Sequence, residues 1–307
     1  MSSTQSILFK VIANTHIYYY TEKMEQYSAK GIKELIDKHG FTFSKSMGQN
    51  FLIDANIPAK IVKMSGIDSS CGVIEIGPGL GAMTAALSNE AGRVVAVELD
   101  RRLLPVLEDA FAGRDNTEII QGDILKMDIA GLANEKIPGM KRHACSNLPY
   151  SITTPAITAL VGSGVFDKIT VMVQREVARR ICALPGSPDY GAFAVYVNYH
   201  HSERKILFDV PPECFLPRPK VYSSVVTMEA RAERLLDSDK EQVFFRVVRA
   251  AFNQRRKTLV NALYASFGNT MGKRAIADAV SSCGFDLNAR GETLGVPEFI
   301  KLAECFL

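Results

Sequence analysis

The sequence lacks any apolar run long enough to cross a lipid bilayer, which takes ~18–20 residues in a helix. The nearest candidate, residues 7–20, is interrupted by Lys10, Asn14 and His16, and no small-residue cleavage site follows it. Arginine is missing before Arg93, whereas a mitochondrial presequence is rich in arginine. We therefore expect a cytoplasmic protein with no membrane contact.

The sequence also lacks the residue spacings of metal sites and disulfide frameworks. Its six cysteines form no C-x-x-C pair, and no two of them are close in sequence. His200 and His201 are adjacent, so on a strand their side chains would point to opposite faces. These spacings predict no bound metal and suit a reducing compartment.

Positive and negative charges nearly balance over the whole chain, but the small positive excess is unevenly distributed. The net charge is +3, yet residues 240–307 hold ten Lys/Arg against six Asp/Glu, and the preceding 239 residues sum to −1. A basic C-terminal module of this kind is either a solvated helical face or a polyanion-binding attachment, and charge alone favours neither. We expect an N-terminal extension over residues 1–26, with Met24 a candidate start, then a larger domain over 27–231 and a helical domain over 232–307.

Strands and helices alternate along the first part of the chain. Short β-branched apolar runs separated by helical stretches are typical of a parallel sheet covered on both faces. Farther on, three strand-like runs follow one another without a helix, which predicts an antiparallel hairpin that closes the sheet. The four prolines of residues 211–219 predict a stiff, extended loop. From about Asp237 the spacing becomes helical, with one helical pattern over Glu241–Phe267. The expected strands are Gly72–Ile76, Arg93–Glu98, Glu118–Gln121, His143–Asn147, Lys168–Gln174, Phe193–His200, Lys205–Val210 and Ser223–Glu229, and the other expected helices are Ile57–Ser65, Ala82–Asn89, Arg102–Phe111, Thr154–Val161, Lys273–Ser282 and Pro297–Phe306.

A glycine-rich loop follows the first of these strands and opens a helix. Gly77, Gly79 and Gly81 fit the G-x-G-x-G pattern of methyltransferases, while Gly77, Gly79 and Ala82 fit the dinucleotide pattern. In both patterns glycines let the backbone approach a ligand and the helix start supplies free N–H groups. The loop therefore predicts a cofactor site without naming the cofactor.

Polar groups at the next two strand ends narrow this prediction. Glu98 ends the second strand, where a carboxylate can accept both hydroxyl protons of an adenosine ribose. Asp123 follows the third strand, where it can accept from an adenine amine while Ile124 packs on the ring. Three suitable strand ends in order indicate a cofactor that contains adenosine.

The fourth strand ends in Asn147-Leu148-Pro149-Tyr150. The N6 amine of adenosine is a poor nucleophile because its lone pair is delocalised into the ring. The Asn147 side-chain oxygen and the Leu148 carbonyl can each accept one N6 hydrogen, which draws the lone pair out of conjugation. Pro149 would fix the turn, and the Tyr150 ring would stack on the base. A dehydrogenase has no need of this tetrad, so the tetrad favours methyl transfer to an adenine amine by positioning alone.

Together these motifs resemble the ribosomal RNA adenine N6-dimethyltransferase family over about residues 40–305, and within it the KsgA-type branch that modifies small-subunit RNA. The resemblance implies S-adenosylmethionine as cofactor. It also implies a Rossmann-like class I methyltransferase sheet, parallel with an antiparallel closing hairpin, plus a small all-α C-terminal domain. Ser46–Leu52 matches the family's N-terminal motif, and Phe215–Val221 matches F-x-P-x-P-x-V, whose Phe215 is expected to stack on the flipped base opposite Tyr150. The implied cofactor-binding residues are Gln49, Asn50, Leu52, Gly77, Glu98, Asp123, Ile124 and Asn147, and the implied catalytic residues are Asn147, Leu148, Pro149, Tyr150 and Phe215.

Other segments favour the small-subunit branch. Erythromycin-resistance methylases usually carry Ile where this chain has Leu148 and Asp where it has Pro155. Phe252–Leu259 resembles the first C-terminal helix of the small-subunit enzymes, and Arg290–Leu294 resembles their R-A-E-x-L motif, with glycine in place of alanine. The expected RNA-binding residues are Arg218 and, on that helix, Arg255, Arg256 and Lys257.

We therefore predict transfer of two methyl groups to each of two adjacent adenosines in the 3′-terminal hairpin loop of 16S rRNA in the small ribosomal subunit, by a monomer. Two alternatives stay open: a 23S rRNA adenine N6-methyltransferase of the macrolide-resistance type, and a mainly non-catalytic checkpoint in 30S assembly. DNA adenine methylation is less favoured because no target-recognition domain is recognisable.

Overall fold

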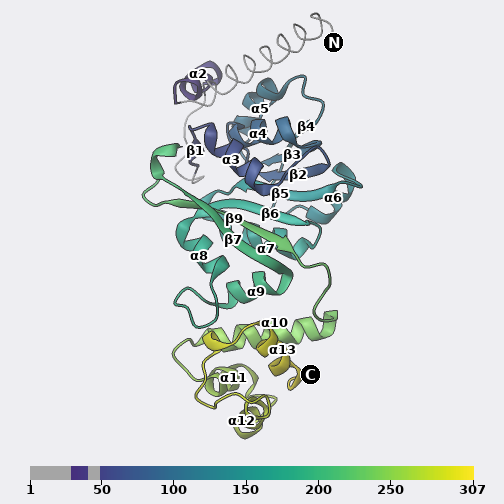
Figure 1. The fold of residues 1–307 in the computed structure, drawn as a ribbon, viewed down its shortest axis with the longest axis vertical. Coiled ribbons are helices and arrows are strands. Elements are labelled where there is room, and N and C mark those ends of the chain that lie inside the picture. The colour runs from purple at the N-terminus through teal and green to yellow at the C-terminus, as the bar shows by residue number, and fades with distance from the viewer. Residues whose placement is uncertain (1–28, 41–48) are drawn as a thin grey trace, which may run out of the picture. The chain divides into compact units, whose positions relative to one another are not determined.

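The computed structural model describes residues 29–40 and 49–307. The expected N-terminal extension, residues 1–26, and residues 46–48 of the N-terminal motif lie outside that range. The described chain forms two compact units (Figure 1). Unit 1 extends to Arg175 and includes Leu207–Val226, and unit 2 comprises Glu176–Ile206 and Thr227–Leu307. The division therefore does not fall at a single point near residue 232, because the segment 176–206 packs with the C-terminal helices.

A seven-stranded sheet has the order β4-β3-β2-β5-β6-β9-β7. The pairs β2–β3, β3–β4, β2–β5 and β5–β6 are parallel. The Ser224 hydroxyl donates to Asp209 at 2.6 Å within unit 1, and the Arg231 amide donates to the His200 carbonyl at 3.0 Å within unit 2. The start of β9 thus lies beside the end of β7, and the end of β9 lies beside the start of β7. These two strands therefore form the expected antiparallel pair. The strands are β2 Cys71–Ile76, β3 Arg93–Glu98, β4 Thr117–Gln121, β5 Lys141–Asn147, β6 Lys168–Gln174, β7 His201–Val210 and β9 Ser223–Ala230, with β1 Phe51–Leu52 and β8 Phe215–Leu216 forming a separate antiparallel pair.

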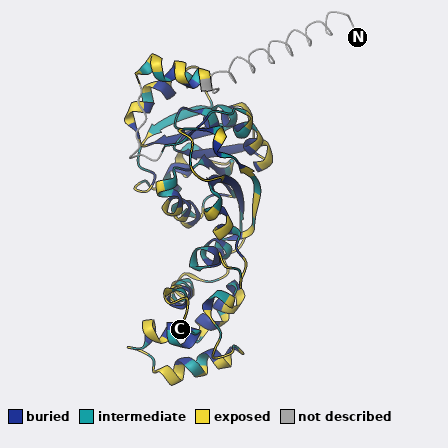
Figure 2. Ribbon diagram, turned by 90° about the vertical axis from the view of Figure 1, so that its left-hand side faces the viewer, coloured by how far each residue is buried: buried dark blue, intermediate teal, exposed yellow. Residues whose placement is uncertain are grey.

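The central strands of unit 1 are buried on both faces, as their apolar sequences predict (Figure 2). From β2 the chain moves one way across the sheet to β3 and β4, then returns to β5 and moves the other way to β6. Helices α4 and α5 lie on one side of these strands and α6 and α7 on the other (Figure 1). The direction of winding reverses between β2 and β5, and ligands of doubly wound sheets bind at the carboxyl ends of strands at such a point. The helices of unit 1 are α2 Ala29–His39, α3 Asn56–Ser65, α4 Ala82–Glu90, α5 Leu104–Phe111, α6 Ile129–Lys136 and α7 Thr153–Ser163, with short 3-10 turns at Arg101–Leu103, Tyr150–Ile152 and Pro212–Cys214.

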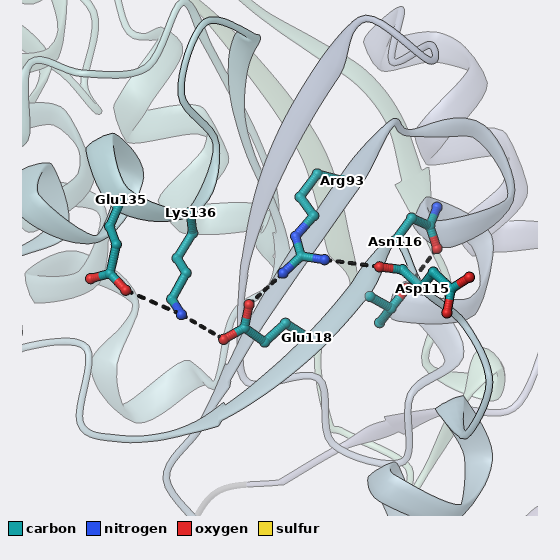
Figure 3. Close-up of polar contacts among 7 residues, drawn as sticks. Arg93, Asp115, Asn116, Glu118, Glu135 and Lys136 are labelled. Atoms are coloured by element: carbon teal, nitrogen blue, oxygen red, sulfur yellow. Dashed lines mark hydrogen bonds and ion pairs between the residues drawn. The ribbon is translucent and has the colours of Figure 1, made fainter.

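An ion-pair network ties the amino-terminal edge of this sheet to α6 (Figure 3). Glu118 on β4 pairs with Arg93, the first residue of β3, and accepts from the Lys136 ammonium at 2.7 Å. Arg93 also donates to the Asp115 carbonyl at 2.9 Å. Lys136, followed by Arg93, lowers the pKa of Glu118. The network lies at the edge opposite the carboxyl ends of the strands, so we assign it to the packing of α6 on the sheet.

One expected strand of unit 2 is a helix. Residues 193–200 belong to α9, Ala192–His200, and not to a strand, so that prediction was wrong. The Tyr199 ring lies 4.8 Å from Phe244 and 5.1 Å from Phe245, both on α10. A helix brings these aromatic side chains onto α10, and that contact outweighs the β-propensity of the run. The helices of unit 2 are α9, α10 Ser238–Asn253, α11 Leu259–Phe267, α12 Lys273–Ser282 and α13 Val296–Glu304, and α8 Arg175–Cys182 begins at the boundary of the units.

The helical pattern over Glu241–Phe267 is two helices, α10 and α11, rather than one. Gln254 leaves the helical region with φ −133° and ψ 72°. Thr258 then caps α11, because its side chain accepts a hydrogen bond from the Asn261 amide. Arg255, Arg256 and Lys257 therefore lie in the turn between the helices, and their expected place on a helix was wrong.

Candidate active site

A cavity of about 280 Å³ opens at the carboxyl ends of β2, β3, β4 and β5, within unit 1. Its place at the reversal of strand order agrees with the rule for doubly wound sheets. The cavity brings together residues from four strand ends, from β1 and from the segment that precedes it. The residues predicted from sequence that line it are Gln49, Asn50, Leu52, Gly77, Glu98, Asp123, Ile124, Asn147, Leu148, Pro149 and Tyr150.

The glycine loop after β2 leaves room for a ligand close to its backbone. Gly79 has a φ of 60°, a conformation that other residues adopt only with strain. A Cβ atom there would lie 3.0 Å from the Phe51 ring, which also lines the cavity. A glycine at this position therefore keeps both the turn and the space beside Phe51.

Glu98 holds the loop and faces the cavity. Its carboxylate accepts from the Asp100 amide at 2.8 Å and from the Gly79 amide at 3.1 Å. The residue is only 4% exposed, and burial raises its pKa above that of an ordinary glutamate, while these two amides oppose the rise. The carboxylate is thus fixed on both sides, with its accessible edge toward the cavity, where it can accept hydroxyl protons.

Gln49 carries a buried acceptor that has no partner within the described part of the chain. Its amide nitrogen donates to Asp100 at 3.2 Å, but its oxygen Oε1 is buried and accepts no hydrogen bond from the residues described. Arg102 donates to both oxygens of Asp100, at 2.9 and 2.6 Å, and lowers the pKa of that carboxyl. A buried, unsatisfied acceptor in the wall of a cavity suits a ligand with a hydrogen-bond donor.

Asp123 and Ile124 form the wall at the end of β4. The Asp123 carboxylate accepts from the Leu125 amide at 3.1 Å and pairs with Lys126 at 3.3 Å. Ile124 is 4% exposed. A carboxylate held by its own turn beside an apolar side chain can recognise the amine edge and the face of a purine.

The residues Asn147–Tyr150 leave β5 with their polar groups held in place. The Asn147 amide nitrogen donates to the Asn50 carbonyl at 3.4 Å, which directs the side-chain oxygen away from that carbonyl. The Leu148 amide donates to the Met172 carbonyl at 3.1 Å, and the Tyr150 hydroxyl lies 2.7 Å from the Ser223 hydroxyl. Burial raises the pKa of Tyr150, so its hydroxyl is neutral at physiological pH. These contacts fix an acceptor and an aromatic ring on one wall of the cavity.

Phe215 lies in the core and does not line the cavity. It is 2% exposed, pairs with Leu52 across the β1–β8 ladder, and belongs to the same core cluster as Val225. The ring therefore supports the strand that carries Leu52, and its stacking on a base opposite Tyr150 stays a prediction.

The expected RNA-binding residues differ in their surroundings. Arg218, in unit 1, is exposed and pairs with Glu213. In unit 2, Arg255 donates to the carbonyls of Pro188 at 3.1 Å and Tyr190 at 3.4 Å. Arg256 and Lys257 are exposed.

Sequence reasoning missed one buried carboxyl group in the cavity wall. Glu75 is 1% exposed, lines the cavity and accepts from the Thr84 hydroxyl at 2.7 Å. Burial raises its pKa to about 8, the Thr84 hydrogen bond opposes the rise, and nearby Glu98 adds to it. Its place in an apolar strand two residues before Gly77 was the available signal, since a charged residue in such a strand needs an explanation.

Within residues 29–40 and 49–307, no helix is both long and apolar enough to span a membrane. The same residues contain no group of three or more His, Cys, Asp or Glu side chains that could hold a metal ion.

The chain is similar to known proteins in sequence and in fold. Residues 40–286 match the family model described as ribosomal RNA adenine dimethylase. The chain is 45% identical over 272 residues to ribosomal RNA small subunit methyltransferase A of Shouchella clausii, covering 88% of this chain and 92% of that protein. A dimethyladenosine transferase from Plasmodium falciparum superposes with a TM-score of 0.67 at 25% identity, covering 82% of this chain and 95% of that one. The 23S rRNA methyltransferase ErmE is alike in fold, with a TM-score of 0.63 at 24% identity over 83% of this chain and 99% of that one. The expected Rossmann-like methyltransferase fold is thereby confirmed.

Proposed function

The chain belongs to the ribosomal RNA adenine dimethylase family, and from that premise we propose that it methylates N6 of two adjacent adenosines in the 3′-terminal hairpin loop of 16S rRNA, using S-adenosylmethionine. The name of the relative from Shouchella clausii supports the small subunit as the source of the RNA. The observation that carries the proposal is the meeting of Asn147 and Tyr150 with Glu98 and Asp123 around one cavity.

The residues of the cavity fit the proposed cofactor. Glu98 would accept the ribose hydroxyls, Asp123 the adenine amine, and the buried Gln49 oxygen a donor of the ligand. The space beside Gly79 suits a ligand close to the backbone. When bound, S-adenosylmethionine supplies a methyl group on a sulfonium centre.

The chain's own residues would activate the target amine by holding it. Because the Asn147 amide nitrogen donates to Asn50, its oxygen is oriented to accept one N6 hydrogen. The Leu148 carbonyl would accept the other, and the Tyr150 ring, anchored through Ser223, would stack on the flipped base. The monomethylated base keeps one N6 hydrogen, so one of these two acceptors would still hold the amine during a second transfer. Preorganised acceptors of this kind accelerate the reaction by stabilising the transition state more than the bound substrate.

The test is methylation of small ribosomal subunits that lack the modification, with 23S rRNA as the alternative substrate. We expect dimethyladenosine in the small-subunit RNA only, identified by mass spectrometry of the nucleotides. Asn147→Ala should lose more than 100-fold in turnover, on the order expected for a transition-state contact, while the protein stays folded. The exposed Asn134→Ala on α6 is the matched control. Methylation of 23S rRNA alone, or full activity of Asn147→Ala, would overturn the proposal.

We also propose that the protein acts as a monomer, because one unit holds every residue of the cavity. The proposed substrate, the RNA of small ribosomal subunits, supports a cytoplasmic location. Light scattering during size-exclusion chromatography tests the monomer, and a mass near twice 33.7 kDa would contradict it.

A further inference from the structure

Arg175 and Tyr222 form a stacked pair on the surface of unit 1. The Arg175 guanidinium lies 4.8 Å from the centre of the Tyr222 ring, and the Arg175 amide donates to the Tyr222 carbonyl at 2.9 Å. The Arg175 side chain is 41% exposed and Tyr222 is 42% exposed. The pair thus presents a planar cation and part of an aromatic ring to solvent.

The pair lies at the same edge of the sheet as the candidate active site. Arg175 directly follows β6, and Met172 of β6 is the register partner of Asn147. Tyr222 directly precedes Ser223, whose hydroxyl lies 2.7 Å from that of Tyr150. The exposed ring therefore belongs to the residue next to Ser223, which anchors the proposed stacking ring of Tyr150.

The pair is held in a fixed arrangement. Asp209 at the end of β7 lies 3.8 Å from the Arg175 guanidinium and accepts from the Ser224 hydroxyl at 2.6 Å. Successive side chains alternate along β9, so Ser223 faces Tyr150 while Tyr222 and Ser224 lie on the side of Arg175 and Asp209. The ring and guanidinium are thus positioned before any partner binds.

The surroundings of the pair favour a polyanion over a protein partner. Arg218 and Lys220 are exposed in the loop that leads to Tyr222, and Arg218 pairs with Glu213 in the same loop. Val221 beside them is 45% exposed. Cations combined with exposed stacking surfaces are the composition of sites for single-stranded nucleic acid.

We propose that Arg175 and Tyr222 bind the nucleotide next to the methylated adenosine, with its base on the Tyr222 ring and its phosphate near Arg175. This inference rests on the proposed function. A flipped base leaves its neighbour unstacked, and an aromatic ring beside the pocket replaces the lost stacking. The pair thereby contributes to the choice of RNA without touching the reacting amine.

The experiment measures steady-state methylation of undermethylated small subunits by Tyr222→Ala, Tyr222→Phe and Arg175→Ala. We expect KM for RNA to rise about tenfold or more in Tyr222→Ala and Arg175→Ala, as the loss of one stacked base or one phosphate contact implies. Tyr222→Phe keeps the ring and should restore KM to within about twofold. Met64→Ala, which removes a side chain that is 43% exposed on α3, is the matched control.

A second measurement separates binding from loop support. With an RNA that is abasic at the nucleotide beside the target, wild-type protein should show the raised KM, and Tyr222→Ala should add little to it. A lower kcat and melting temperature at unchanged KM would mean that the pair only supports Ser223, and would overturn the inference. An unchanged KM in every variant would also overturn it. No methylation by wild-type protein would instead refute the proposed function itself.

Discussion

Glu75 is a carboxyl group that folding removes from water. It is 1% exposed, and burial raises its pKa to about 8 from 4.5. Folding therefore favours the protonated form, which the Thr84 hydroxyl and the cavity wall surround. This group stabilises the fold most fully below pH 4.5, and that contribution is lost as pH rises to about 8.

Glu75→Gln should remove this pH dependence, because glutamine keeps the shape of the neutral acid and an acceptor for Thr84. The free energy of unfolding of the variant minus that of wild type should therefore increase by about 2–3 kcal/mol as the pH rises from 6 to 9. Urea unfolding across this range measures the change. Glu90→Gln, at the exposed end of α4, is the control, and parallel pH profiles for Glu75→Gln and wild type would contradict the prediction.

Ser223 affects catalysis through Tyr150 in the proposed mechanism. Ser223→Ala removes a hydrogen bond worth about 0.5–1.5 kcal/mol, so kcat should fall about 2- to 10-fold. Tyr150→Phe should cause a similar loss, and the double variant should lose no more than either single one, since both remove the same contact. Additive losses would show that the two residues act separately.

A glycine of the cofactor loop allows helix α5 to pack closely against that loop. Gly81 has a φ of 89°, and a Cβ atom there would lie 2.7 Å from the Phe111 ring on α5. Gly81→Ala should therefore cost about 2–4 kcal/mol, from backbone strain and from the displaced ring. Gly113→Ala has a similar φ of 77° but meets nothing within 4 Å, so it should cost only about 1–2 kcal/mol. Denaturant unfolding compares the two, and equal losses would mean that packing against Phe111 contributes nothing.

The elements of unit 1 could be predicted from sequence because local pattern and final environment agree there. β3 and β6 have the predicted ends, since strands buried on both faces are continuous apolar runs. α9 could not be predicted, because its Val and Tyr residues resemble a strand and its partner Phe244 lies more than 40 residues later. The break after Asn253 was missed because apolar spacing continues across the Thr258 cap.

In the candidate site, too, side chains set by local sequence could be predicted, and those set by contacts between distant segments could not. Strand ends revealed Glu98, Asp123 and Asn147, because parallel strands bring their carboxyl ends together. The surroundings of Phe215 and the burial of Glu75 depend on contacts between distant segments, which no local motif specifies.

At the scale of the whole molecule, unit 2 has its own core and much of the basic charge. Phe244, Leu263 and Phe299 belong to a single cluster within this unit. The excess of cations over residues 240–307 is therefore carried by a separately packed body. We propose that this charge binds rRNA, and the turn after α10 allows the proposal to be tested with two neighbouring residues.

Replacing Arg255 and replacing Arg256 should change the melting temperature differently, because Arg255 makes contacts within unit 2 and Arg256 is exposed. Arg255 binds two carbonyls and lies 3.5 Å from Glu292. Arg256 is exposed, and within the described chain its side chain forms no ion pair. Arg255→Ala should lower the melting temperature by about 2–6 °C, whereas Arg256→Ala should leave it unchanged.

For RNA binding we expect the opposite: if Arg256 contacts a phosphate, Arg256→Ala weakens binding more than Arg255→Ala does. Arg256→Ala should reduce the slope of log affinity against log salt concentration by about 1. Titration of a 16S rRNA 3′ fragment between 50 and 200 mM salt, the range over which phosphate contacts change affinity most visibly, measures the slope. Because both variants remove one positive charge, a general loss of attraction would change both slopes equally. Equal slopes would therefore contradict a specific phosphate contact, while a change confined to Arg256→Ala would locate that contact in the turn between α10 and α11.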